Sequence, residues 1–123
     1  MTHTYHDIMS LSDILLEESY VLDIEAHPSV LEFKIDFALT QDHPDYQPPA
    51  GDEMYCYRRG WLRFCGVTRF LWSNQGAPPA RDATGEVGFG NIDSLLRHHA
   101  GYSLEGDWGQ MELIAEGVDV RLQ

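Results

Sequence analysis

One aromatic segment of this sequence concentrates the residues best suited to recognition chemistry. It holds half of the eight basic residues of the chain, namely Arg58, Arg59, Arg63 and Arg69. Guanidinium groups pair with carboxylates and stack on aromatic rings, so this segment could form a face that binds an anion or a carboxylate-bearing partner. The candidate binding residues are therefore Tyr57, Arg58, Arg59, Trp61 and Arg63.

The same arginines also have a structural interpretation. On a strand they could pair with acidic residues of neighbouring strands, such as Glu32 and Asp36. Cross-strand charge pairing is a common use of such faces, so this interpretation is the favoured one.

Metal and catalytic motifs are missing from the sequence. Two histidines near the N-terminus could bind a divalent ion only if that end were ordered. On a helix, His98 and His99 would point about 100° apart and would not share a metal ion. There is no nucleophile elbow, phosphate-binding loop, dinucleotide glycine fingerprint, Cys-x-x-Cys pair or zinc-protease helix. We therefore predict no catalytic residue, no metal and no cofactor, and an enzyme is the less favoured interpretation.

The overall charge narrows the classes of partner. Twenty Asp and Glu against eight Lys and Arg give a formal charge of -12. This negative potential would repel nucleic acid and anionic membrane surfaces, whereas it would steer a basic protein toward the chain. No apolar run approaches membrane-spanning length and the first residues do not resemble a secretion signal, so a cytoplasmic location is expected. Cys56 and Cys65 are expected to remain thiols there.

The elements that position these residues are predicted to be strands of a single domain, residues 1–123, with residues 1–8 prone to fraying. The clearest strand covers residues 31–39, where every second residue is apolar. Alternation over residues 20–27, with Tyr20, Leu22, Ile24 and Ala26 on the apolar side, predicts another strand. A turn at Pro28 and Ser29 would join the two as an antiparallel hairpin. Residues 9–18 could begin a short helix or enter the first strand directly.

The middle of the chain alternates between loops and strands. Residues 41–52 and 73–85 are predicted loops because they are rich in Pro and Gly, and residues 85–90 predict a short strand. Residues 54–72 are too long for one strand, and Gly60 is expected to bend or break it. If Gly60 and Trp61 form a hairpin turn, Cys56 lies opposite Cys65; if the strand continues, that pairing does not follow.

The last third of the chain predicts a short helix and then strands. Apolar spacing after Asn91 favours a helix that ends at Gly101. Alternation from Tyr102 to the end predicts two or three strands, with breaks near Gly106 and Gly117. Together these elements predict a mainly β protein, an antiparallel β-sandwich or partly open barrel with one or two short helices.

A pattern in this sequence resembles that of known proteins, and it covers residues 57–67, the preceding strand pair and the ending at residues 104–122. This pattern resembles small acidic bacterial β-rich proteins of unknown function, some of which look like immunity proteins of contact-dependent toxin systems. The resemblance implies an acidic β-domain that binds and masks a protein target, and it transfers no catalytic residue.

Three functions remain open from the sequence. The first is a non-enzymatic protein-binding module, of immunity or inhibitor type. The second is a small-ligand or metal-binding β-domain, which could be an enzyme, with a cleft lined by Tyr55, Tyr57, Trp61, Trp72 and Trp108. The third is a homo-oligomeric structural subunit that associates through an uncovered sheet edge, for example as a homodimer.

Overall fold

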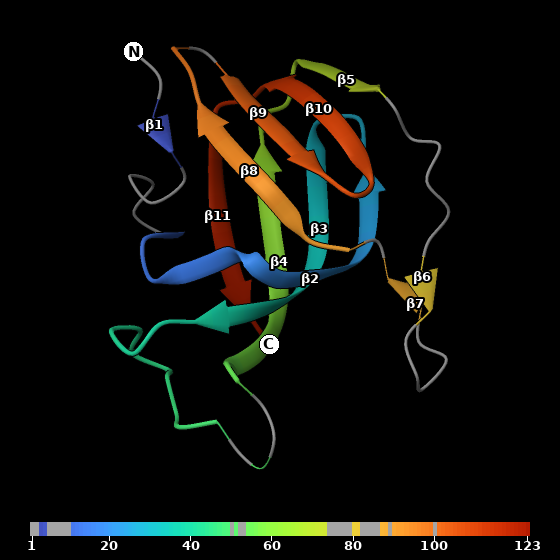
Figure 1. The fold of residues 1–123 in the computed structure, drawn as a ribbon. Helices are drawn as coiled ribbons and strands as arrows, with labels where there is room; N and C mark the ends of the chain where they lie inside the picture. Colours follow the sequence, from blue (N-terminus) through green and yellow to red (C-terminus); the bar gives the residue numbers. More distant parts are fainter. Residues whose placement is uncertain are drawn as a thin grey trace.

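Two antiparallel β-sheets face each other across one apolar core (Figure 1). The structure is a computed structural model, and it describes residues 3–4, 11–49, 51, 54–73, 80–81, 87–88, 90–99 and 101–123. The predicted mainly antiparallel β class is confirmed, and of the two predicted architectures the sandwich fits, because the sheets do not close into a barrel.

The first sheet has four strands in the order β11-β4-β3-β2. These strands are β2 (Ile14–Ala26), β3 (Val30–Leu39), β4 (Cys56–Cys65) and β11 (Gly117–Leu122).

The second sheet has five strands in the order β1-β8-β9-β10-β5. They are β1 (His3–Thr4), β5 (Arg69–Ser73), β8 (Ile92–Arg97), β9 (Gly101–Gly106) and β10 (Gly109–Ile114). In Figure 1, β8 and β9 run obliquely across β3 and β4. Two short strands, β6 (Ala80–Arg81) and β7 (Val87–Gly88), pair separately.

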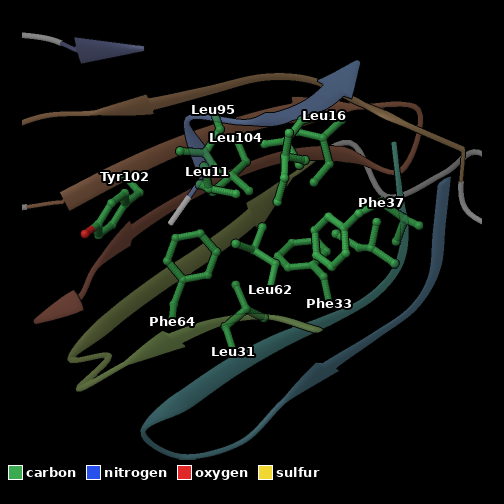
Figure 2. Close-up of a cluster of buried hydrophobic side chains, with 14 of the residues drawn as sticks. Leu11, Leu16, Leu31, Phe33, Phe37, Leu62, Phe64, Leu95, Tyr102 and Leu104 are labelled. Atoms are coloured by element: carbon green, nitrogen blue, oxygen red, sulfur yellow. The ribbon is translucent and has the colours of Figure 1, made fainter. Parts of the chain in front are cut away.

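Strand β3 supplies the centre of the core, as its alternation predicted. Its inward residues are each no more than 2% exposed: Leu31, Phe33, Ile35, Phe37 and Leu39. Figure 2 shows Phe33 and Phe64 among the aliphatic side chains of both sheets. The Phe64 ring lies 5.0 Å from the ring of Tyr102 in the opposite sheet, in an edge-to-face contact. Full burial of such a side chain contributes about 1.5–3 kcal/mol to stability.

The predicted β2–β3 hairpin is confirmed, but the predicted apolar face of β2 is wrong in its first half. Val21 is fully buried, whereas Tyr20 is 55% exposed. Register shifts between Leu15 and Tyr20 and between Val21 and Asp23 cause the difference. Each extra residue in a β-bulge moves the following side chains to the opposite face. Of the two alternatives for residues 9–18, the strand holds from Ile14 onward.

Gly60 is not a turn residue, because β4 runs through it without interruption. Cys56 and Cys65 therefore lie at opposite ends of one strand, and both are free thiols. A side chain at Gly60 would collide with the carbonyl oxygen of Arg121 in β11, which explains the glycine. The chain instead turns at Gly66, whose φ of 64° lies in the left-handed region, and then enters the other sheet as β5.

The predicted helix after Asn91 is wrong, and no helix occurs among the described residues. Residues 92–97 form β8, which pairs with β9 and buries Ile92 and Leu95. A short apolar run is compatible with the period of a helix and with that of a strand, and here the pairing of residues 92–97 with β9 makes the segment a strand. Asn91 does not cap a helix; its amide donates a hydrogen bond to the carbonyl oxygen of Glu17 in β2.

The other predicted connections agree with the structure where it describes them. Residues 41–49 contain no strand, and three strands, β9, β10 and β11, follow as predicted. Strand β7 falls within the predicted strand at 85–90, while β6 lies in a segment predicted as loop. At the end expected to fray, His3 and Thr4 pair with β8. Residues 1–2, 5–10, 50, 52–53, 74–79, 82–86, 89 and 100 lie outside the described residues.

Candidate binding face

Four of the five candidate residues share one surface of the four-stranded sheet. Leu62 and Phe64 of β4 point into the core, so the intervening Trp61 and Arg63 point outward, as do Tyr57 and Arg59. We call this surface the outer face. It consists of these four side chains and the residues beside them in the cross-strand rows Glu25-Glu32-Arg63-Asp119, Asp23-Lys34-Trp61-Arg121 and Tyr20-Asp36-Arg59.

Arg58 does not belong to the outer face. It lies opposite Phe37, a core residue, and therefore has the opposite orientation. Its guanidinium group donates a hydrogen bond to the carbonyl oxygen of Gln123 over 3.1 Å. Arg58 therefore lies on the opposite face of β4 from Arg59 and Arg63 and is bonded to the last residue of the chain, while its predicted part in binding stays a prediction.

Charge pairing on the outer face follows the structural interpretation of the arginines. Arg59 forms two hydrogen bonds with the carboxylate of Asp36, at 2.9 Å and 3.3 Å. Arg63 lies 3.9 Å from Glu32. These partly exposed pairs each contribute no more than about 1 kcal/mol, so their main effect is to hold the side chains in place.

Two buried polar atoms of the outer face have no hydrogen-bond partner among the described residues. They are Nε of Arg63 and Oδ1 of Asp119, which belong to residues paired across β4 and β11. Buried polar atoms are normally satisfied.

A cluster of three tyrosines lies at one end of the outer face. The ring of Tyr57 is 5.8 Å from that of Tyr20 and 6.1 Å from that of Tyr55. Burial raises the pKa of Tyr57 to about 12, with further contributions from Tyr20, Glu18 and Tyr55. The phenol therefore stays protonated near neutral pH and is unsuited to act there as a general base.

The second sheet carries a row of three hydrogen-bonded polar side chains that the sequence analysis did not predict. Nε2 of His98 lies 2.5 Å from Oγ of Ser103, which donates a hydrogen bond of 2.7 Å to Glu112. Only the register of β8, β9 and β10 brings these residues together, so spacing along the chain gave no signal. Because Ser103 gives its single proton to Glu112, its oxygen accepts from His98. In an activated serine nucleophile the imidazole accepts the serine proton, so this arrangement is different.

The five aromatic residues proposed to line a cleft do not gather around one cleft, although Tyr55 contacts Tyr57 and Trp72 contacts Trp108. Trp108 is 2% exposed between the sheets, and the indole nitrogen of Trp72 donates to its carbonyl oxygen over 3.0 Å. Tyr55 belongs to the tyrosine cluster with Tyr57, whereas Trp61 borders a hollow of only about 40 Å³ on the outer face. Ligand pockets are usually larger than about 300 Å³.

A larger hollow of about 280 Å³ lies between the β2–β3 turn and β5, and one of about 320 Å³ lies over β5 and β10. Among the described residues, no three side chains of His, Cys, Asp or Glu are placed to hold a metal ion. The side chains of the N-terminal histidines lie outside the described residues.

Comparison with family models, with curated proteins and with solved structures finds no match to this chain. The resemblance to immunity-like β-rich proteins therefore stays a prediction. The described part of the chain contains no helix that is long and apolar enough to cross a membrane.

Proposed function

We propose that this chain is a non-enzymatic protein-binding module, of immunity or inhibitor type, and that it binds through the outer face. The observation that carries the proposal is the gathering of Tyr57, Arg59, Trp61 and Arg63 on one surface. Tyr, Trp and Arg are the residues most enriched where protein interfaces gain their binding energy. Ion pairs already orient the arginines, which lowers the entropy cost of binding.

The charge around the outer face supports a basic partner. Strand β2 lies at the edge of the sheet and carries four exposed acidic residues: Glu17, Glu18, Asp23 and Glu25. Across the rows of the face itself, acidic and basic residues nearly balance. A basic protein would be attracted by the chain's charge of -12 and would meet an aromatic surface beside an acidic edge.

Affinity capture with a matched pair of variants tests this proposal. The chain is immobilised at low salt, and the retained proteins are identified and bound again in purified form. Trp61→Ala should weaken binding of the true partner at least tenfold, the size expected for a central aromatic anchor. Leu71→Ala, on the other sheet, should leave it unchanged. The proposal fails if no purified partner binds, or if both variants bind it as the parent does.

Association into a homodimer is the second candidate, and a separate observation favours it. Edge strand β5 exposes 59% of Leu71, and neighbouring Ile114 is 41% exposed. Exposed apolar sheet edges tend to pair with another chain. Sedimentation at two concentrations should then show a dimer that Leu71→Glu abolishes, and a monomer at both concentrations rejects this candidate.

A further inference from the structure

The tyrosine cluster is assembled across three strands. Tyr20 belongs to β2 and Tyr57 to β4, and Tyr55 comes just before the first residue of β4. Strand β3 separates them, and its residue opposite Tyr57 is Ala38. Because alanine has only a methyl group, the Tyr57 ring can reach over β3 to Tyr20, where the two rings lie 5.8 Å apart.

The rings of the cluster are inclined to one another and partly open to solvent. The plane of Tyr57 makes angles of 40° with Tyr20 and 76° with Tyr55. Tyr20 keeps 55% of its surface exposed. Inclined aromatic rings present negative π-faces, which attract cations.

An exposed carboxylate adds to this negative potential. Glu18 lies two residues before Tyr20 on the acidic edge strand, and it is close enough to help raise the pKa of Tyr57. The nearest arginine on the same face of β4, Arg59, is bound to the carboxylate of Asp36 through two nitrogen atoms. The two hydrogen bonds of Arg59 therefore go to Asp36 and not to the carboxylate of Glu18.

We propose that Tyr20, Tyr55, Tyr57 and Glu18 form a cation site that takes a Lys or Arg side chain of the protein partner. This inference rests on the proposed function and deepens it, because it states which side chain of a basic partner enters the face and where. The ring faces supply cation–π attraction, and Glu18 supplies the countercharge.

The site is tested on the isolated chain with small probes. Capped Gly-Lys-Gly and Gly-Arg-Gly are titrated while the aromatic NMR signals of the tyrosines are followed, and capped Gly-norleucine-Gly serves as the uncharged control. The two basic peptides should shift the signals of Tyr20 and Tyr57, and the norleucine peptide should not. Equal binding of the norleucine peptide, or no shift with either basic peptide, overturns the inference.

Variants at the exposed Tyr20 separate ring chemistry from bulk. Tyr20→Leu should weaken binding of the basic peptides about three- to tenfold, because it removes the π-face, whereas Tyr20→Phe should stay within about twofold. Glu18→Gln should also weaken binding, while Glu112→Gln on the other sheet should not. Equal losses in the Leu and Phe variants would contradict cation–π binding.

The two proposals fail in distinguishable ways. If the basic peptides bind as described but Tyr20→Leu does not weaken binding of the purified partner, the inference about the partner's side chain is wrong. If Trp61→Ala leaves partner binding unchanged, the proposed function fails whatever the peptides do.

Discussion

Tyr57 carries a phenol whose protonation is coupled to folding. Burial, helped by Tyr20 and Glu18, raises its pKa from the ordinary value of 10.0 to about 12. Folding therefore favours the neutral phenol. The stability that this preference contributes is complete below about pH 10, and it is lost as the pH rises toward about 12.

Replacing Tyr57 by Phe should reduce the alkaline loss of stability. The free energy of unfolding is measured by urea titration at several pH values between neutrality and pH 12. We expect the parent to lose stability more steeply above pH 10 than Tyr57→Phe does, because only the parent carries this phenol. An equally steep fall in Tyr57→Phe would contradict the coupling.

Gly60 shows a steric requirement at a single position. A methyl group there would overlap the carbonyl oxygen of Arg121, whereas at Gly117 nothing lies within 4 Å of an added Cβ. Gly60→Ala should therefore lower the free energy of unfolding by about 1–3 kcal/mol. Gly117→Ala should change it by less than about 0.5 kcal/mol. Similar values for the two variants, measured by urea unfolding, would show that close approach of β11 does not explain the glycine.

At this scale, strand alternation predicted some partners and missed others. It predicted that arginines of this segment pair with acidic residues of a neighbouring strand, such as Glu32 and Asp36, and the structure pairs Arg63 with Glu32 and Arg59 with Asp36. The alternation did not separate Arg58 from them. That separation required knowing that β4 continues through Gly60, so that residues 58 and 59 point to opposite faces.

The β-bulge in β2 is the element that creates the tyrosine cluster. Ser19 is 1% exposed, accepts a hydrogen bond from the amide of Ala38 and donates one to the carbonyl oxygen of Leu15. It thus satisfies backbone groups where the ladder is irregular. The bulge also turns Tyr20 outward and Val21 into the core.

Ser19→Ala should lower the free energy of unfolding by about 1–3 kcal/mol, because the buried amide of Ala38 loses its acceptor. Hydrogen exchange at the Ala38 amide should accelerate more than exchange elsewhere in β3. Ser73→Ala, at an exposed position of β5, is the matched control and should leave both quantities unchanged. Unaltered exchange at Ala38 would remove the stated role of Ser19.

Elements with strict alternation could be predicted, and those with mixed signals could not. Strand β3 and the three C-terminal strands follow an uninterrupted two-residue period. The bulged β2 and the apolar run at residues 92–97 do not follow such a period. In these two segments, hydrogen bonds to neighbouring strands determine which side chains point into the core. The tyrosine cluster could not be predicted for the same reason, since it depends on the bulge at Ser19.

For the whole molecule, the sequence indicated the class of fold and the sign of the net charge, but it did not indicate which side chains form the outer face. Composition and period predicted a mainly antiparallel β protein, either a sandwich or a partly open barrel. Which aromatic residues pack against the core depends on strand order, and only the structure separates buried Trp108 and the partly buried Trp72 beside it from Trp61 on the outer face.

The three indole N–H signals of this chain offer the most direct test of the central claim, that the outer face is the binding face. They are followed by NMR while the purified partner is added. The signal of Trp61 should shift or broaden, whereas those of buried Trp108 and of Trp72, which belongs to the other sheet and packs against the core, should hold their positions. An unmoved Trp61 signal with the partner fully bound would contradict the claim.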